Sequence, residues 1–223
     1  MIVEPEIAAE PEEGNPGHGP IFAPRARRGG IIWAMAGLET LSIPDPALVV
    51  LVGAAGAGKS TFAARHFAPD EVVSSDALRE AIAGDAADQR ASGPAFAALH
   101  RTVTRRLAAG RLTVVDATNV TPDARRELTR RARRAGVPAV AVVLDLPADL
   151  VMARNGARPG RRVPADVVRH QLADLAASLR AGMAGEGWAA ILRFDDPAVI
   201  DAVRVERGAA RPAEAEGDPA GGS

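Results

Sequence analysis

Residues 48–61 read Leu-Val-Val-Leu-Val-Gly-Ala-Ala-Gly-Ala-Gly-Lys-Ser-Thr. The five apolar residues at the start predict a buried strand, and the glycines after them predict a tight turn. A helix pattern begins at Lys59. A turn that joins a buried strand to a helix directs backbone N–H groups and the positive end of the helix dipole toward one point. The stretch therefore predicts a site for a phosphate group.

The spacing of Gly53, Gly58, Lys59 and Ser60 matches the phosphate-binding loop pattern GxxxxGKS/T. We expect Lys59 to reach the β- and γ-phosphates of ATP, and the Ser60 hydroxyl to bind Mg²⁺. Lys59 is also the only lysine of a chain whose other permanent cations are arginines. The alternative is a glycine turn that only joins a strand to a helix. The residues expected to contact the nucleotide are Gly53, Ala54, Ala55, Gly56, Ala57, Gly58, Lys59, Ser60 and Thr61.

The composition limits the possible chemistry. The chain has 223 residues, 47% of them hydrophobic, and no cysteine, so it can build a sizeable core but has no disulfide and no cysteine-based zinc site. No apolar run approaches the roughly 20 residues of a membrane span, and the acidic N-terminus lacks the features of a signal peptide. We therefore expect a cytoplasmic enzyme that does not bind a membrane.

Charge and composition also suggest the domain boundaries. Residues 1–46 are rich in Pro, Gly, Glu and Arg, and we expect them to be a disordered extension, or a misassigned one if the native protein begins at Met35. Residues 47–206 are expected to form one domain, and residues 207–223 a flexible tail. The formal net charge is −1, but residues 47–205 carry 22 Lys and Arg against 17 Asp and Glu. A mildly basic domain is compatible with a polyanionic partner.

Between these ends, strand patterns alternate with helix patterns. Because the strands are continuous apolar runs, they predict an α/β fold with a parallel sheet of about five strands and helices on both faces. Strands are expected at 47–52, 71–74, 112–115, 139–144, 190–194 and 202–205. Helices are expected at 59–68, 77–83, 93–110, 122–136, 148–155 and from 164 onward. The third of these helices carries Phe96, Leu99, Val103 and Leu107 on one face.

Two charged residues follow the second strand. Ligands bind at the carboxyl ends of the strands in an open parallel sheet, which makes Asp76 and Arg79 candidates. Asp76 could accept a proton from a hydroxyl and orient that hydroxyl toward the γ-phosphate. Arg79 lies one helical turn later and could hold an anionic group of the acceptor. The alternative is that Ser75 or Asp76 only caps the following helix.

A third acid, Asp116, ends the third strand. It resembles the Walker-B carboxylate that supports Mg²⁺, so we expect it to act with Ser60. The alternative is a capping residue in a polar turn. No glutamate follows Asp116. Motor ATPases usually have one there to activate water, and its absence favours phosphoryl transfer over hydrolysis.

Residues 154–163 are rich in Arg, Gly and Pro and lie between two expected helices. Such a loop is typical of a kinase lid, in which arginines close over the transferred phosphoryl group. Arg154 is the main candidate for this role, and Arg158 is expected to contact the nucleotide. The alternative is a solvated basic loop.

Other charged and aromatic residues suggest ordinary roles. We expect the arginines of residues 125–134 to form the solvated face of a helix, although a nucleic-acid contact there is possible. Aromatic residues make up 3% of the chain and Tyr is absent, so we do not expect a base-stacking platform of the kind used by single-strand binding proteins. The arginines in question are Arg125, Arg126, Arg130, Arg131, Arg133 and Arg134.

Together these motifs resemble the kinase domain of bacterial polynucleotide kinase-phosphatases, which are RNA-repair enzymes. The resemblance runs from about Leu48 to Val205 and is carried by the segments at 53–63, 73–79, 113–119 and 154–164. It implies a P-loop kinase fold and transfer of a phosphoryl group from ATP, with Mg²⁺, to the 5′-hydroxyl of RNA or DNA. It also implies the site roles: ATP and metal binding by Lys59 and Ser60, general base Asp76, acceptor-phosphate ligand Arg79 and lid arginine Arg154.

Two other functions stay open from the sequence. The repair enzymes carry further phosphatase and ligase-like domains that this sequence does not show, which leaves the acceptor open. One alternative is a kinase of a small molecule or a nucleotide sugar, similar to the zeta toxins. The other is an ATP-binding regulatory module with little turnover.

Overall fold

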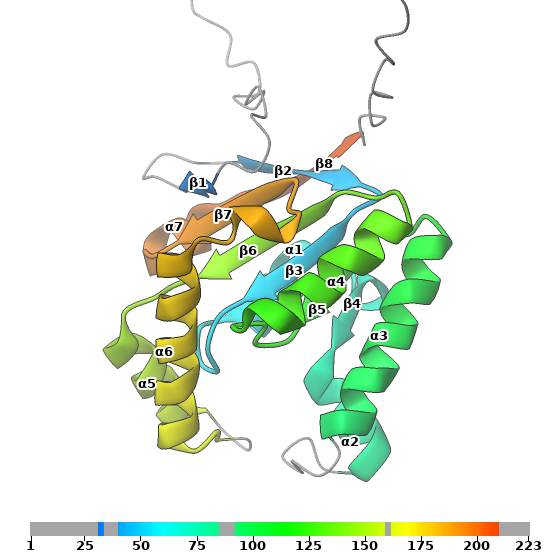
Figure 1. The fold of residues 1–223 in the computed structure, drawn as a ribbon. Helices are drawn as coiled ribbons and strands as arrows, with labels where there is room; N and C mark the ends of the chain where they lie inside the picture. The colour runs from blue at the N-terminus through cyan, green and yellow to red at the C-terminus, as the bar shows by residue number, and fades with distance from the viewer. Residues whose placement is uncertain (1–30, 34–39, 85–91, 159–161, 210–223) are drawn as a thin grey trace, which may run out of the picture.

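The computed structural model describes residues 31–33, 40–84, 92–158 and 162–209 (Figure 1). At their centre is a parallel sheet of six strands in the order β1-β7-β6-β3-β5-β4. Five of these strands form where the apolar runs predict them, and β1 is added at one edge. The predicted α/β class is confirmed. The strands are β1 (Ile31–Trp33), β3 (Leu48–Val52), β4 (Val72–Ser74), β5 (Thr113–Asp116), β6 (Ala139–Leu144) and β7 (Ala190–Phe194).

The strand that leads into the glycine turn, β3, lies between β5 and β6 in this sheet. Its side chains alternate between the two faces. Val49 and Leu51 pack in one hydrophobic cluster, whereas Leu48, Val50 and Val52 pack in the other. All five residues are completely buried. A strand covered on both faces has no solvated side, which is why it reads as a continuous apolar run.

Helices cover both faces of the sheet (Figure 1). Leu99 of α3 and Leu128 of α4 pack on one face, and Phe62 of α1 and Ile200 of α7 pack on the other. At the carboxyl ends of the strands, α5 and α6 lie on one side and α2 and α3 on the opposite side. Within the described ranges, no helix is both long enough and apolar enough to cross a membrane. The helices are α1 (Lys59–His66), α2 (Ser75–Ala83), α3 (Ser92–Ala108), α4 (Pro122–Arg134), α5 (Ala148–Ala157), α6 (Ala165–Ala181) and α7 (Pro197–Ala202), with short 3₁₀ turns η1 (Pro69–Glu71) and η3 (Ala184–Glu186).

A second, two-stranded sheet extends the domain beyond its expected limits at residues 47 and 206. Strand β2 (Thr40–Asp45) pairs in parallel with β8 (Arg204–Ala209). Leu41 and Ile43 of β2 are buried in the core, so ordered structure begins before residue 47 and extends past residue 206. Residues 1–30 and Met35 lie outside the described ranges.

The strand expected at 202–205 is also displaced. Pro197 occupies the first turn of α7, and the Asp196 carboxylate caps that helix by accepting a hydrogen bond from the Ala198 amide at 2.7 Å. A helix with these start signals is favoured over an extended segment. As a result, β8 begins only at Arg204 and joins β2 rather than the central sheet.

Candidate active site

The phosphate-binding loop connects β3 to α1 at the centre of the main sheet. Gly56 has a φ of 93°, and Gly58, the N-cap of α1, has a φ of 95°. Residues other than glycine rarely adopt these left-handed values. A Cβ atom on Gly56 would also lie 2.5 Å from the carbonyl oxygen of Val151 in α5. The loop therefore needs glycine at both positions, for its course and for its close packing on α5.

Lys59, the first residue of α1, folds back over this loop. Its Nζ donates hydrogen bonds to the carbonyl oxygens of Gly53 and Ala54, each at 2.9 Å. The residue is only 8% exposed, yet it lines the cleft described below. Its ammonium group is thus held at the place where a phosphate bound by the loop amides would lie.

Ser60 and Asp116 meet beside the loop, as their positions after two strands predict. The Ser60 hydroxyl donates a hydrogen bond of 2.7 Å to Oδ2 of Asp116, which is 7% exposed at the end of β5. Mg²⁺ prefers oxygen ligands, and it usually takes one or two from the protein and the rest from phosphates and water. The hydroxyl and carboxylate oxygens of this pair are suited to that ion.

Asp76 and Arg79 form an ion pair in the first turns of α2. Nη2 of Arg79 lies 2.6 Å from Oδ1 of Asp76, and the two side chains are 8% and 35% exposed. Burial lowers the pKa of the Arg79 guanidinium. Neither Ser75 nor Asp76 caps the helix, because the Ser74 hydroxyl accepts the hydrogen bonds from the Asp76 and Ala77 amides. The capping alternative for Asp76 is therefore wrong, and its carboxylate is directed elsewhere.

The arginines at the end of α5 lie across from this pair. Arg154 and Arg158 are exposed and both line the cleft. A Cβ atom on Gly58 would lie 3.9 Å from Nη1 of Arg154, which places that guanidinium beside the phosphate loop. The expected lid extends over 154–163, and its residues 159–161 lie outside the described ranges.

A cleft of about 570 Å³ brings all of these residues together. Volumes of this order accommodate a nucleotide-sized ligand. On one side the cleft is lined by α5, α6 and α7, and on the other by α2 and the start of α3. The expected site residues that line it are Ala55, Gly56, Ala57, Gly58, Lys59, Ser60, Thr61, Asp76, Arg79, Asp116, Arg154 and Arg158. The other two expected residues, Gly53 and Ala54, do not line the cleft, and their carbonyl oxygens accept the hydrogen bonds from Lys59.

Sequence comparison identifies the family. A family model described as AAA domain matches residues 48–181, which is more than half of the chain. The chain belongs to this P-loop kinase family. No curated protein sequence matches it at a significant level.

Solved structures similar to this chain include several kinases. A chain of the Pnkp1/Rnl/Hen1 RNA repair complex is 24% identical, with a TM-score of 0.51, and the match covers 62% of this chain and 47% of that chain. A sugar kinase from Janibacter sp. HTCC2649 is 25% identical, with a TM-score of 0.48 and coverages of 70% and 91%. Shikimate kinase from Acinetobacter baumannii, in complex with shikimate, is 22% identical, with a TM-score of 0.44 and coverages of 70% and 88%. The match thus spans about half the length of the RNA repair chain, and that likeness shows the fold.

Two amide side chains of the candidate site were not predicted. Oε1 of Gln171 in α6 accepts a hydrogen bond of 2.8 Å from the Ala55 amide of the phosphate loop. Asn155 binds both backbone groups of Val163, with Nδ2 donating to the carbonyl oxygen at 2.8 Å and Oδ1 accepting from the amide at 3.2 Å. Asn155 therefore joins the two ends of the Arg-rich segment at 154–163. Nothing in the local sequence distinguishes these two residues from ordinary helical amides.

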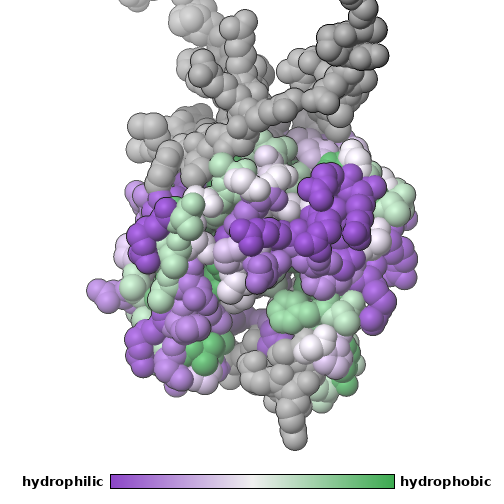
Figure 2. Space-filling view, in the orientation of Figure 1, coloured by the Kyte–Doolittle hydropathy of each residue, from purple (hydrophilic) through white to green (hydrophobic). Residues whose placement is uncertain are grey.

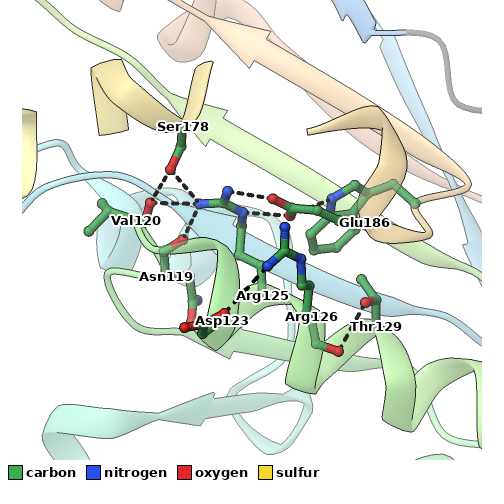
Figure 3. Close-up of polar contacts among 9 residues, drawn as sticks. Asn119, Val120, Asp123, Arg125, Arg126, Thr129, Ser178 and Glu186 are labelled. Atoms are coloured by element: carbon green, nitrogen blue, oxygen red, sulfur yellow. Dashed lines mark hydrogen bonds and ion pairs between the residues drawn. The ribbon is translucent and has the colours of Figure 1, made fainter. Parts of the chain in front are cut away.

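Arg125 was expected on a solvated helix face, but it forms a buried ion pair next to the turn that follows β5 (Figure 3). The Arg125 side chain is completely buried, and it pairs with Glu186 of η3 through contacts of 2.8 and 2.7 Å. Its Nη1 also donates to the carbonyl oxygens of Asn119 and Val120, at 3.1 and 2.7 Å. Arg125 lies on the same face of α4 as the buried Leu128, a spacing that could have revealed its burial.

Other arginines of that helix do lie at the surface. Arg126, Arg130, Arg133 and Arg134 are exposed, as predicted. Arg131 is half-buried, because its guanidinium donates hydrogen bonds to Thr104 of α3 and to Glu127. Figure 2 shows hydrophilic side chains gathered over α3 and α4. Arg125 is thus the arginine of this run that departs furthest from the prediction, because it binds the turn that follows β5.

Proposed function

We propose that this P-loop kinase transfers the γ-phosphoryl group of ATP to the 5′-hydroxyl end of RNA or DNA. The observation that carries the proposal is the Asp76–Arg79 pair, which faces the same cleft as the phosphate loop. A base beside a cation suits an acceptor that has a hydroxyl and an anionic group close together. The 5′-terminal nucleotide of a polynucleotide has both, because its 3′ oxygen carries a phosphodiester. The similarity to a chain of an RNA repair complex agrees with this choice.

The donor half of the site is formed by the loop and by α1. The loop amides and the Lys59 ammonium hold the β- and γ-phosphates of ATP. Ser60 and Asp116 would hold Mg²⁺, which neutralises phosphate charge when it is bound. Because ATP is supplied inside the cell, the proposal includes a cytoplasmic location.

The acceptor half is formed by α2. Asp76 accepts the proton of the 5′-hydroxyl, whose oxygen attacks the γ-phosphorus in line with the departing oxygen. A new bond forms between the 5′ oxygen and phosphorus while the bond to the β,γ-bridging oxygen breaks, and ADP leaves with that electron pair. Arg79 holds the 3′ phosphate of the same nucleotide and so orients its hydroxyl.

Arg154 and Arg158 complete the site from the opposite side. Arg154 lies beside the phosphate loop and neutralises the charge on the transferring phosphoryl group and on ADP. Its side chain is exposed, so it can move toward the phosphates once they are bound. The two hydrogen bonds between Asn155 and Val163 hold the ends of the Arg-rich segment together during this movement.

A panel of acceptors tests this proposal. Radiolabelled ATP is offered with a 5′-hydroxyl oligonucleotide, a nucleoside 3′-monophosphate, the unmodified nucleoside and simple sugars. We expect labelling of the first two and little of the others, because only the first two offer an anion to Arg79. Arg79→Gln should remove the preference, whereas Arg126→Gln on the exposed face of α4 should keep it. Transfer to nucleosides or sugars but not to oligonucleotides would support a small-molecule kinase instead.

A further inference from the structure

One aromatic residue departs from the buried stripe of α3. Leu99, Val103 and Leu107 follow helical spacing and are 1%, 0% and 2% exposed. Phe96 precedes Leu99 by one turn and continues the same stripe, yet it is 38% exposed. The start of α3 lies beside α2, beyond the carboxyl ends of the strands (Figure 1). The Phe96 ring therefore lies outside the core and lines the cleft instead.

The ring lies in the acceptor half of the cleft. Phe96 stands at the start of α3, which packs against α2, and α2 carries Asp76 and Arg79. The donor-side residues Arg154 and Arg158 come from α5, on the opposite side. An acceptor bound to Asp76 and Arg79 therefore has the ring of Phe96 on its own side of the cleft, whereas the exposed Val167 lines the cleft from α6.

Exposed apolar surface is rare in the described part of the chain. The large hydrophobic residues exposed there are Ile82, Phe96 and Val167, and Phe96 is the one aromatic residue among them. Ile82 does not line the cleft. An aromatic ring left in contact with water inside a binding cleft forgoes the free energy of its own burial. A flat ligand that covers the ring would recover that free energy.

We propose that Phe96 determines acceptor specificity by stacking on the base of the 5′-terminal nucleotide; this inference rests on the proposed polynucleotide kinase activity. Every nucleobase has a π face, so one ring stacks on any of them. Asp76 and Arg79 bind the hydroxyl and the phosphate, and Phe96 binds the base, so the three residues together recognise one whole nucleotide.

A single ring contacts a single base. The low aromatic content of the chain excludes an extended stacking platform, but it leaves room for one contact at the terminal nucleotide. Recognition should therefore depend on the presence of the first base and vary little with its identity. The following nucleotides should contribute through their phosphates.

Steady-state kinetics with two acceptors test this role. One is a 5′-hydroxyl oligonucleotide, and the other is the same oligonucleotide with an abasic 5′-terminal residue. For wild type, removal of the base should raise the acceptor KM about tenfold, the effect expected when one stacked base is lost. Phe96→Ala should raise the KM of the intact acceptor by a similar factor, leave the KM of ATP unchanged and leave the abasic acceptor unaffected.

Two further variants keep the test decisive. Phe96→Leu retains apolar volume but lacks the aromatic face, so it should lose most of the difference between the two acceptors even if Phe96→Ala fails to fold. Ile82→Ala removes an exposed apolar side chain of α2 outside the cleft and should behave as wild type. An equal loss on both acceptors, or no loss on either, would overturn the role of Phe96. Failure of wild type to label the intact oligonucleotide would instead refute the proposed kinase activity itself.

Discussion

The hydroxyl of Ser60 donates a hydrogen bond to Oδ2 of Asp116 across 2.7 Å, although 56 positions separate the two residues. The contact exists because β3 and β5 are adjacent parallel strands whose carboxyl ends meet at one edge of the sheet. It joins the phosphate loop to the acid that follows β5.

The first prediction concerns this pair. Asp116→Asn should raise the Mg²⁺ concentration needed for half-maximal transfer by about ten- to hundredfold, because the carboxylate charge that supports the ion is lost. A Mg²⁺ titration of the transfer rate, and of fluorescent ATP-analogue binding, measures this shift. Asp123→Asn, at a carboxylate that is 96% exposed, is the matched control and should leave the titration unchanged. An unaltered titration for Asp116→Asn would contradict the assignment.

Lys59 provides the second prediction. Lys59→Ala should lower the transfer rate by about 100-fold or more, because contacts to Gly53 and Ala54 hold its ammonium group over the loop. Lys59→Arg should not restore the activity, since the planar guanidinium cannot replace a compact ammonium group in an 8% exposed position. Transfer rates and ATP affinity are measured together. Near-normal transfer by Lys59→Arg would show that only the charge is required.

The third prediction concerns the buried pair of Arg125 and Glu186. Arg125→Met should lower the free energy of unfolding by about 3–5 kcal/mol, because it leaves the Glu186 carboxylate buried without its cation. Urea denaturation measures the loss. Arg126→Met, at the next position but with a side chain 57% exposed, should change stability by less than about 0.5 kcal/mol. Equal effects of the two replacements would contradict a structural role for the buried pair.

The fourth prediction is a pH dependence of stability. Burial lowers the pKa of His100 below its ordinary value, and the Arg131 cation lowers it further, while Glu127 acts in the opposite direction. The unfolded state then binds more protons than the folded state once the pH falls below about 6.5. Stability should therefore be fully present above that pH and decline as the pH falls toward the folded pKa. His100→Gln should reduce this decline in urea-denaturation midpoints, and an unchanged decline would rule out His100 as its source.

The sequence predicts the centre of the fold well because burial leaves a clear pattern there. The predicted ranges of β6 and β7 equal the observed ones, because a strand covered on both faces forms a continuous apolar run. Asp76 and Asp116 could be placed near the phosphate loop because parallel strands end at a common edge. These inferences need only local patterns and one rule of topology.

Other features depend on contacts that a local pattern does not contain. Strand β2 contains Pro44 and lies in a segment rich in Pro, Gly and Glu, so its alternation of Leu41 and Ile43 is easily missed. Helical spacing can suggest that Arg125 is buried, but it cannot identify the partner that makes the burial possible, Glu186, which is 61 positions away. The exposure of Phe96 depends on where the sheet ends rather than on helical spacing, which assigns the ring to the core.

The most direct test of the central claim is phosphoryl transfer by wild type, Asp76→Asn and Asp123→Asn. Each is incubated with γ-labelled ATP and a 5′-hydroxyl oligonucleotide, and the label at the 5′ end is measured under single-turnover conditions. We predict efficient transfer by wild type and Asp123→Asn, and a loss of about 100-fold or more for Asp76→Asn with ATP binding retained. Undiminished transfer by Asp76→Asn would contradict its role as the base, and absence of transfer by wild type would contradict the proposed activity.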